Sequence, residues 1–349
     1  MDSKIFSIDG RGKFVDEIVK VYNSKFKEDI TKEMIESPDR LIRGSVKVEQ
    51  FSDNEIEVNF EETIRGLKVY LVCSTNTTKN LTKLFLAIDA AKKASAEEII
   101  AVIPYYGYAR QDRKAMRGSS GASLFARLLQ ESGVDRVVSI DLHAEQIQGF
   151  FKIPVDHIRG KYIFPWYIEE MKLENLTLCS PDAGGVKRVD AIMKKLQSKN
   201  SEINMVMLSK RRDKPNSIES MDLIGDVKGR NVIIIDDIVD TAGTLCKAAS
   251  KLIEAGALSV RAICTHGVLS GKAIDNIGNS VLTELIISDT LPVPEQEWFG
   301  DDLPLVPKYD MYYEFEKKLK VVSTAHPIAR LIQAINNKQS ANILEEIEK

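Results

Sequence analysis

The sequence predicts an α/β protein with two similar domains, each a mostly parallel sheet flanked by helices. Short runs rich in valine and isoleucine recur along the chain, and segments with helical periodicity lie between them. Several of these runs lack alternating polar residues, which is typical of strands covered on both faces. Strand–helix alternation favours βαβ units, and so many runs in 349 residues suit two parallel sheets better than one.

Eight apolar runs are predicted to be strands, and they are distributed over most of the chain. They cover residues 68–74, 98–104, 136–142, 176–181, 204–209, 231–237, 260–267 and 284–290. Their lengths are within the usual range for strands in globular proteins.

Four segments are predicted to be helices, and residues 241–257 contain the clearest of them. Its apolar residues follow the i, i+3, i+4, i+7, i+8 spacing of an amphipathic helix, at Leu245, Ala248, Ala249, Leu252 and Ile253. Gly256 occupies the position where glycine commonly follows a helix. Residues 81–95, 121–133 and 323–337 have similar patterns.

A domain boundary is predicted within residues 153–162, where a proline and a glycine bracket a change of pattern. The first domain is then residues 1–158 and the second is residues 159–317. The C-terminal segment 318–349 is expected to pack back on the first domain. Residues 25–47 are highly charged and weakly periodic, so we expect a surface helix and loop there.

The composition excludes several classes of protein. The chain is 44% hydrophobic and 28% charged, and its net charge of −3 gives no indication of nucleic-acid binding. Its four cysteines form no C-x-x-C pair, which favours buried thiols in a reducing compartment over zinc binding. No apolar run approaches the roughly 18 residues of a membrane span, and the N-terminus lacks the pattern of a signal peptide. We therefore expect a cytoplasmic protein without a membrane or nucleic-acid partner.

Polar clusters follow five of the predicted strands. They occupy residues 104–114, 141–143, 180–188, 209–214 and 236–244. In open parallel sheets, ligands bind beyond the carboxyl ends of the strands. The sequence therefore predicts a ligand site at these strand ends, although position alone does not give its chemistry.

The cluster within "NVIIIDDIVDTAGTL" (231–245) is the most informative. Four aliphatic residues precede Asp236 and Asp237, and Asp240 follows. A small hydroxylated turn comes next, formed by Thr241, Ala242, Gly243 and Thr244. A turn that starts a helix favours an anion such as phosphate. Carboxylates beside a phosphate need a partner that requires acceptors, such as sugar hydroxyls or Mg²⁺, so the combination predicts a sugar-phosphate site.

The stretch "VIIIDDIVDTAGT" resembles the ribose-5-phosphate and phosphoribosyl pyrophosphate motif of type I phosphoribosyltransferase folds. That motif alone leaves open a phosphoribosyltransferase or the synthase that makes phosphoribosyl pyrophosphate. Five further segments resemble ribose-phosphate pyrophosphokinases and favour the second possibility; they are residues 108–114, 141–151, 180–185, 210–216 and 265–271. The resemblance covers most of the chain from about Phe51 onward.

The resemblance implies transfer of the β,γ-diphosphoryl group of ATP to the 1-hydroxyl of ribose 5-phosphate, giving phosphoribosyl pyrophosphate and AMP. It also implies Mg²⁺, an ATP-binding first domain, a second domain that binds ribose 5-phosphate, and an active site between them. A homo-oligomer, a hexamer in the family, is a further implication. The chain has no Walker A pattern, so its ATP site must be built in another way.

By this resemblance, ATP is bound by Phe51, Asp53, Glu55, Arg110, Gln111 and His143. Residues 51–57 alternate with period two, which suits a strand or hairpin with Phe51, Asp53 and Glu55 on one side. An aromatic face with nearby acceptors suits adenine, although a half-exposed strand without a ligand would have the same pattern. His143 is expected to contact Mg²⁺ or a phosphate oxygen. The other histidines, His157, His266 and His326, are expected to be structural or at the surface.

The transferred diphosphate is expected to bind a loop formed by Asp182, Ala183, Gly184 and Gly185. Asp182 is also the expected carboxylate ligand of Mg²⁺. Lys210 and Arg212 are the expected catalytic residues, because displacement at phosphorus needs alignment and cations rather than covalent help. They begin a polar stretch, residues 210–222, that we expect to be a mobile loop.

Two segments depart from the family pattern. The family has a Ser-Gly turn where this chain has "FSIDGRG" (6–12), and an Arg-x-Pro segment where it has "AMRGSSGAS" (115–123). The second segment is expected to be a flexible turn rather than a phosphate loop. A non-catalytic regulatory homologue is the remaining alternative. Such a protein should have a degraded Lys-x-Arg sequence, whereas this chain keeps Lys210 and Arg212.

Overall fold

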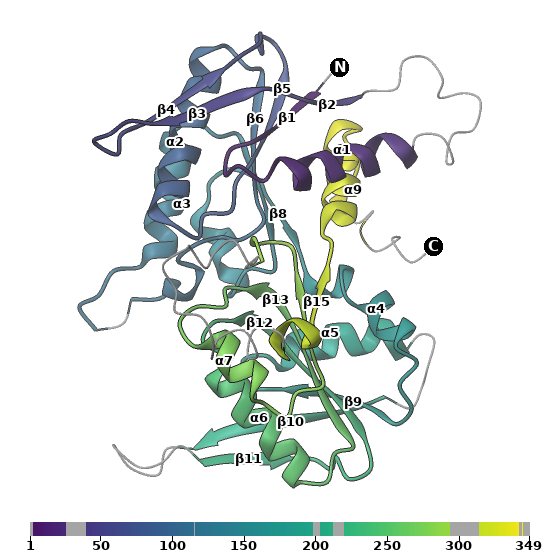
Figure 1. The fold of residues 1–349 in the computed structure, drawn as a ribbon. Coiled ribbons are helices and arrows are strands. Elements are labelled where there is room, and N and C mark those ends of the chain that lie inside the picture. Colours follow the sequence, from purple (N-terminus) through teal and green to yellow (C-terminus); the bar gives the residue numbers. More distant parts are fainter. Residues whose placement is uncertain are drawn as a thin grey trace. The chain divides into compact units, whose positions relative to one another are not determined.

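The structure, a computed structural model, describes residues 3–25, 40–114, 116–197, 203–211, 220–293, 314–341 and 344. The chain forms two compact units. One contains Met1–Arg159 with Thr324–Lys349, and the other contains Gly160–Ser323. Each unit is a mostly parallel sheet flanked by helices, so the predicted α/β fold class is confirmed (Figure 1).

The first unit contains a six-stranded sheet in which every neighbouring pair is parallel. In spatial order its strands are β2 (Leu41–Arg43), β1 (Ser3–Ser7), β5 (Lys68–Val72), β6 (Glu98–Ile103), β7 (Arg136–Ile140) and β8 (Val155–Ile158). Three of them, β5, β6 and β7, match predicted apolar runs. The strands β1, β2 and β8 were not predicted, because they are short and mix polar with apolar residues.

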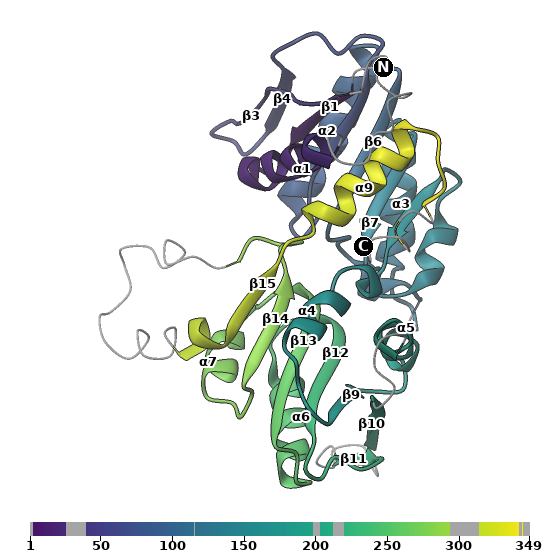
Figure 2. The ribbon, with the colours of Figure 1, turned by 90° about the vertical axis from the view of Figure 1, so that its right-hand side faces the viewer.

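Four helices cover the two faces of this sheet (Figures 1 and 2). The helices α2 (Thr78–Lys93) and α3 (Gly121–Glu131) pack on one face, and they share its hydrophobic core with buried strand residues. The helices α1 (Gly12–Lys25) and α9 (Ala325–Asn336) lie side by side on the other face. The C-terminal helix is therefore part of the first unit.

A separate hairpin of β3 (Val46–Gln50) and β4 (Ile56–Phe60) packs against α2. The predicted surface helix and loop at residues 25–47 is wrong in its described part, which contains β2 and the start of β3. Short edge strands and hairpins expose much of their length, so their residues look like a charged loop in the sequence. Residues 26–39 lie outside the described part of the chain.

Asn336, in the last turn of α9, joins that helix to the rest of the first unit. Its side-chain oxygen accepts a hydrogen bond from the Tyr70 hydroxyl at 2.8 Å. Its amide nitrogen contacts the hydroxyls of Tyr22 and Ser3 at 3.0 and 3.1 Å. Both tyrosines are completely buried. The side chain therefore satisfies polar groups from α1, β1 and β5 at once.

Replacing Asn336 with alanine is expected to destabilise the protein by about 2 kcal/mol, because buried hydroxyl groups lose their partner. Thermal unfolding of the full chain measures this as a lower melting temperature. Asn337→Ala, at the exposed next position, is the matched control and should leave the melting temperature almost unchanged. Equal melting temperatures for the two variants would show that Asn336 does not hold the helix.

The second unit contains a seven-stranded sheet that is parallel except at one edge pair. In spatial order its strands are β11 (Ser220–Ile224), β10 (Asn204–Arg211), β9 (Leu176–Ser180), β12 (Asn231–Val239), β13 (Ser259–Gly267), β14 (Glu284–Ser288) and β15 (Leu319–Val322). Residues 318–349 were predicted to pack on the first domain, and this is wrong for β15. That strand pairs in parallel with β14, which places it in the sheet of the second unit.

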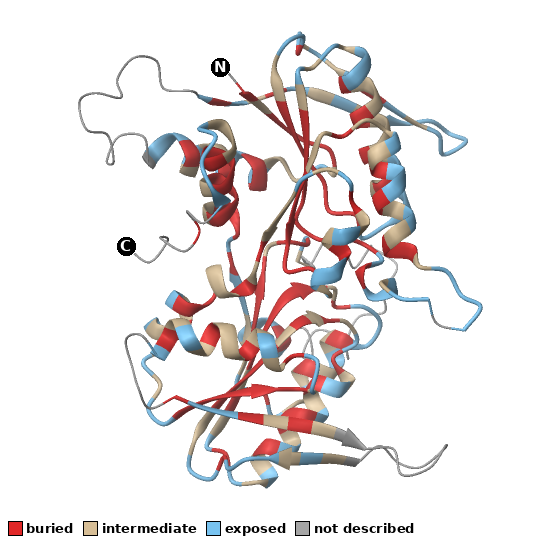
Figure 3. Ribbon diagram, turned by 180° about the vertical axis from the view of Figure 1, so that it is seen from behind, coloured by how far each residue is buried: buried red, intermediate tan, exposed pale blue. Residues whose placement is uncertain are grey.

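The helices of the second unit also lie on both faces of its sheet. They are α4 (Pro165–Glu170) and α5 (Val186–Gln197) on one face, and α6 (Gly243–Glu254) and α7 (Ala273–Gly278) on the other. The central strands of both sheets are mostly buried, and the longer helices expose only their outer faces (Figure 3). Across the part of the chain that the structure describes, no helix combines the length and apolar character needed to cross a membrane.

Candidate functional site

Three strand ends of the first unit are tied together by a network that the sequence did not predict. The carboxylate of Asp9 accepts hydrogen bonds from Arg11 Nε at 3.0 Å and from the Ser74 backbone N–H at 2.9 Å. The Ser74 hydroxyl in turn accepts hydrogen bonds from Arg11 Nη2 at 2.8 Å and from the Tyr105 N–H at 3.3 Å. The Asp9 side chain is 3% exposed, so it braces the loops after β1, β5 and β6 from inside. In the sequence, the only sign of this network was that residues 6–12 differ from the family pattern.

The loop after β6 is held close to the loop after β5. The Thr75 hydroxyl accepts a hydrogen bond from the Gly107 N–H at 2.8 Å. A Cβ atom at Gly107 would lie 2.0 Å from the Thr75 carbonyl oxygen, so only glycine allows this approach. The close approach positions the short 3₁₀ helix η2 (Ala109–Gln111) at the end of the sheet. Two predicted ATP contacts, Arg110 and Gln111, are exposed on η2.

A second glycine lets η2 pack on the start of α3. A Cβ atom at Gly121 would lie 2.7 Å from the side-chain oxygen of Gln111 and 3.2 Å from Tyr108. In the departing segment 115–123, the described residues Met116 and Arg117 form a turn, and α3 begins at Gly121. Gly121 therefore has a packing role beside Gln111, a predicted ATP contact.

The loop after β7 presents His143 to solvent. Asp141 is buried with φ +38°, and its N–H donates to the Ile158 carbonyl oxygen at 2.7 Å. The Leu142 N–H donates to His157 Nε2 at 2.8 Å. His157 was expected to be structural or at the surface, and its contact fixes the backbone beside His143. The positive φ at Asp141 is a strained conformation of the kind that clusters at functional sites.

Phe51, Asp53 and Glu55 lie in the turn between β3 and β4 rather than on one face of a strand. The Phe51 N–H donates to the Glu55 carbonyl oxygen at 2.9 Å, and Asn54 has φ +73°. Asp53 Oδ1 accepts the Glu55 N–H at 3.1 Å. The hairpin option of the prediction is therefore correct, but the period-two strand is wrong for residues 51–55. The turn leaves the Phe51 ring half exposed, as stacking on a planar ligand requires.

In the second unit, β12 contains Asp236 and Asp237, as does the predicted run 231–237, and it extends two residues beyond that run. The strand continues to Val239, because it pairs with β13 as far as Gly267. Asp237 is buried, whereas the side chain of Asp236 is 32% exposed. The Asp237 N–H donates to Asp236 Oδ1 at 2.9 Å, which fixes the rotamer of the more exposed carboxylate.

Arg188 lies beside both carboxylates. Its Nη1 atom is 3.5 Å from Asp237 Oδ1 and 3.8 Å from Asp236 Oδ1. Burial, followed by the charge of Asp237, raises the pKa of Asp236, and the Arg188 guanidinium opposes that rise. Arg188 was not among the predicted site residues, because "VKR" after two glycines resembles an ordinary exposed first turn of a helix.

The loop from Asp240 to Thr244 has the features of an anion site. Ala242 precedes α6 with φ +60°, a conformation that costs a non-glycine residue roughly 1–2 kcal/mol. Thr241 and Thr244 are exposed. A Cβ atom at Gly243 would meet nothing within 4 Å, so the protein's own packing does not require glycine there. The backbone N–H groups at the start of α6 are therefore open to a ligand.

The loop from Asp240 to Thr244 is braced by the segment after β13. The Ser270 N–H donates to the Asp240 carbonyl oxygen at 3.1 Å, and the Ser270 hydroxyl bonds the Asp240 carboxylate. The Asn276 side chain donates to the Thr241 carbonyl oxygen at 2.8 Å. Asp240 therefore contributes to the conformation of the loop.

The predicted diphosphate loop joins β9 to α5. Asp182 Oδ1 accepts the Gly185 N–H at 2.9 Å, and the Ser180 hydroxyl donates to the Asp182 carbonyl oxygen at 2.6 Å. A Cβ atom at Gly185 would lie 2.8 Å from Ser180 Oγ, so that position needs glycine. Ala183 and Gly184 are exposed at the tip of the loop.

Asp182 fits the requirements of a Mg²⁺ ligand. The ion prefers oxygen ligands, and one or two carboxylates with substrate phosphates can hold it. Asp182 is half-buried, and its Oδ2 atom has no hydrogen-bond or ionic partner among the described residues. An imidazole such as that of His143 suits a phosphate oxygen better than this hard cation. No group of three or more histidine, cysteine, aspartate or glutamate side chains suited to a metal ion occurs in the described ranges.

The polar stretch at residues 210–222 is strand at both ends, which corrects the prediction of a loop over its whole length. Lys210 lies on β10 and is paired with Met221 of β11 in an antiparallel ladder. The side chain of Lys210 and all of Arg212 lie outside the described residues, so their predicted roles stay predictions.

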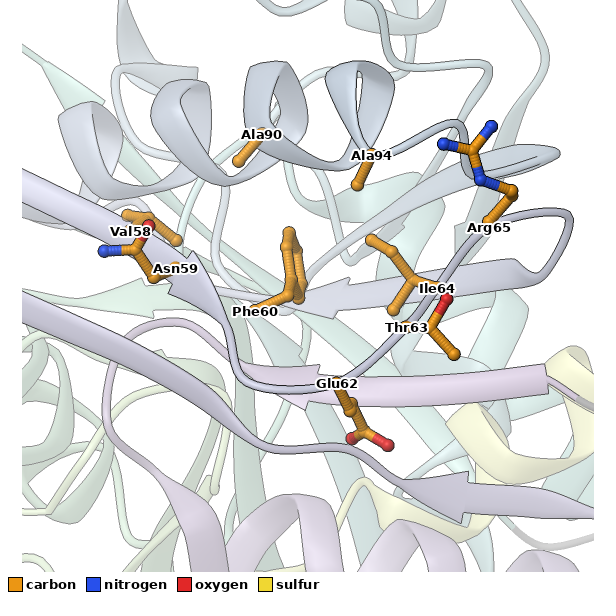
Figure 4. Close-up of a pocket in the computed structure, with 9 residues that line it drawn as sticks. All are labelled: Val58, Asn59, Phe60, Glu62, Thr63, Ile64, Arg65, Ala90 and Ala94. Carbon is orange, nitrogen blue, oxygen red and sulfur yellow. The ribbon is translucent and has the colours of Figure 1, made fainter.

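A cavity of about 360 Å³ lies elsewhere in the first unit, between β4, the segment after it and α2 (Figure 4). Its lining consists of Val58, Asn59, Phe60, Glu62, Thr63, Ile64, Arg65, Ala90 and Ala94. None of the residues predicted to bind ATP lines it. Most of the described site residues are instead at or near the ends of parallel strands, and Phe51, Asp53 and Glu55 lie in the turn of the β3–β4 hairpin.

Two family models match the chain. Residues 4–133 match the model of the N-terminal domain of ribose phosphate pyrophosphokinase. Residues 186–303 match the model of the phosphoribosyl synthetase-associated domain. Together the matches reach both units.

Whole-length relatives have the same description. The ribose-phosphate pyrophosphokinase of Campylobacter jejuni subsp. jejuni is 45% identical over 85% of this chain and 89% of its own. The enzyme of that name from Bacillus subtilis strain 168 is 43% identical over 81% of this chain and 88% of its own. The crystal structure of phosphoribosylpyrophosphate synthetase from Mycobacterium smegmatis is similar at a TM-score of 0.79 and 31% identity, covering 97% of this chain and 100% of that one.

Proposed function

Because this chain belongs to the ribose-phosphate pyrophosphokinase family, we propose that it transfers the β,γ-diphosphoryl group of ATP to the 1-hydroxyl of ribose 5-phosphate. The products would be phosphoribosyl pyrophosphate, a precursor for nucleotide biosynthesis, and AMP. The observation that carries the proposal is the pair Asp236 and Asp237 beside the open helix start at Gly243. That pairing of acceptors and anion site matches the hydroxyls and the phosphate of a single sugar phosphate.

Ribose 5-phosphate is proposed to bind the second unit. Asp236 and Asp237 would accept hydrogen bonds from the 2- and 3-hydroxyls, since ionised carboxylates are strong acceptors. The 5-phosphate would bind the backbone N–H groups and hydroxyls from Thr241 to Thr244. The positive end of the α6 dipole favours the phosphate charge there.

ATP is proposed to bind residues of the first unit. The Phe51 ring would stack on adenine, and Asp53 Oδ2 and Glu55 would be acceptors for its amino group. Arg110 and Gln111, both exposed on η2, would contact the phosphates. His143 would donate to a phosphate oxygen or reach the metal ion.

The reaction is proposed to require Mg²⁺, which would be held by Asp182 together with substrate oxygens. When bound, the ion would neutralise phosphate charge. The loop from Asp182 to Gly185 would position the transferred diphosphate. Its backbone N–H groups would donate hydrogen bonds to the diphosphate, and its glycines would leave room for the diphosphate to approach the backbone.

In the proposed step, the 1-hydroxyl oxygen of the sugar bonds to the β-phosphorus of ATP. The bond from that phosphorus to the α,β-bridging oxygen breaks, AMP leaves, and the hydroxyl proton is released to solvent. Lys210 and Arg212 would stabilise the charge on the transferring group and the leaving oxygen. Lysine supplies a compact charge there, and arginine supplies a bidentate fork.

Two further properties are proposed from the family alone. The protein is expected to work as a homo-oligomer, a hexamer by resemblance, and to be cytoplasmic. Nucleic acid and membranes are not among its proposed partners. A phosphoribosyltransferase would not need the first-unit residues that are proposed to bind ATP.

The proposal is tested by incubating the purified protein with Mg²⁺ and ATP, with and without ribose 5-phosphate, and separating AMP from ADP by chromatography. AMP that forms only when the sugar phosphate is present supports the proposed enzyme. If no AMP forms over a range of added inorganic phosphate concentrations, the result favours the alternative that this chain is a non-catalytic regulatory homologue.

A further inference from the structure

Arg188 occupies the junction between the two predicted subsites of the second unit. It lies in the first turn of α5, directly after the loop proposed to bind diphosphate. Its guanidinium reaches Asp236 and Asp237, which are proposed to bind the sugar hydroxyls. Its side chain is only 18% exposed, so it is a largely buried cation rather than a solvated one.

The two carboxylates need such a cation. They are adjacent in sequence on one strand, and Asp237 is only 6% exposed at its side chain. Two neighbouring carboxylates cannot both ionise easily in a poorly solvated site, and a protonated carboxyl group loses an acceptor position. A sugar diol requires acceptors on both residues. The charge of Arg188 is therefore a condition for the acceptor chemistry of the pair.

The distances indicate how Arg188 acts. At 3.5 and 3.8 Å from the two carboxylates, Nη1 is beyond the usual range of N–H···O hydrogen bonds. The arginine therefore acts on both residues mainly through its charge.

We propose that Arg188 is a positioning residue of the sugar site, whose charge favours the ionised form of Asp236 and Asp237 and so their acceptance of hydrogen bonds from the vicinal hydroxyls of ribose 5-phosphate. This inference rests on the proposed function, because it assigns a determinant of sugar recognition within the same site. The role proposed for Arg188 differs from those of Lys210 and Arg212, which are proposed to stabilise charge on the reacting phosphates.

The first test compares Arg188→Gln and Arg188→Lys in the full-length protein by steady-state kinetics. Arg188→Gln should raise the KM for ribose 5-phosphate by about 10- to 100-fold and change the KM for ATP by less than about threefold. Arg188→Lys should recover most of the loss, because a charge suffices at these distances. Lys187→Gln is the matched control, since it removes the same charge from an exposed neighbour and should change neither KM.

The second test does not need turnover. Isothermal calorimetry compares the binding of ribose 5-phosphate with that of 2-deoxyribose 5-phosphate, which lacks one of the hydroxyls. The wild-type protein should prefer the ribose compound, and Arg188→Gln should lose most of that preference while melting at a temperature similar to wild type. Because this readout is binding, it tests Arg188 even if no AMP is formed and the proposed reaction fails.

Three outcomes would overturn the inference. A lower kcat with an unchanged KM for ribose 5-phosphate would place Arg188 on the transferred phosphates. Equal losses in Arg188→Lys and Arg188→Gln would mean that the shape of the guanidinium matters rather than its charge. An unchanged preference for the ribose compound in Arg188→Gln would show that Arg188 does not contribute to recognition of the sugar hydroxyls.

Discussion

Replacing Lys210 with alanine is expected to lower kcat by about a thousandfold, with KM values for ATP and ribose 5-phosphate within about threefold of wild type. The proposed reaction develops negative charge on the transferring group and on the leaving oxygen of AMP. A positioned cation stabilises that charge more in the transition state than in the ground state, so its loss affects turnover rather than binding. Steady-state measurement of AMP formation by the full-length variant gives both parameters.

Lys214→Ala is the control for this prediction, because it removes the same charge from the same polar stretch of sequence. It should keep kcat within about threefold of wild type. Near-normal turnover of Lys210→Ala would refute the catalytic role of that lysine. A loss confined to KM would instead assign it to ground-state binding.

Replacing Asp237 with asparagine is expected to raise the KM for ribose 5-phosphate by about a hundredfold, because the amide removes a charged acceptor from a buried position. Asparagine keeps the shape of the side chain, and Asp237 is 4% exposed, so the loss is chemical rather than steric. Initial rates over a range of ribose 5-phosphate concentrations measure the effect. Asp275→Asn, at an exposed position of α7, should leave that KM unchanged. A KM within about threefold of wild type for Asp237→Asn would contradict the proposed diol contact.

The same substitution should not lower the stability of the protein without substrate. Burial and the charge of Asp237 raise the pKa of Asp236 in the folded protein. A carboxyl group with a raised folded pKa destabilises the native state progressively as pH rises from its ordinary value toward the raised one. Asp237→Asn removes one cause of that rise. Its melting temperature at neutral pH should therefore equal or exceed that of wild type, which separates a binding defect from unfolding.

The long buried strands could be predicted because their own apolar residues indicate that they are buried. The strands β5, β6, β9 and β12 are mostly buried on both faces, so each contains a run of mainly apolar residues without regular polar alternation. Edge strands such as β2 expose part of their length and have no such pattern. The end of β12 was predicted two residues too early, because the pairing of its last residues with β13 depends on another segment.

The candidate site was predictable where one segment carries the whole chemistry. Residues 236–244 combine acceptors and a helix start within nine positions, so their sequence indicates a sugar phosphate. Arg188 could not be predicted in this way, because its position in the site depends on contacts with carboxylates that are 48 and 49 positions away in the chain. Asp9 is similar, since its partner Ser74 belongs to a different strand end.

The measurement that tests the central claim most directly uses ATP labelled with ³²P at the β-phosphorus, together with Mg²⁺ and ribose 5-phosphate. Attack on that phosphorus transfers the label, and we predict that it appears in the sugar product in a one-to-one ratio with AMP. Label that stays in the nucleotide as ADP, while the sugar gains a single phosphoryl group, would show attack on the γ-phosphorus and contradict the proposed diphosphoryl transfer.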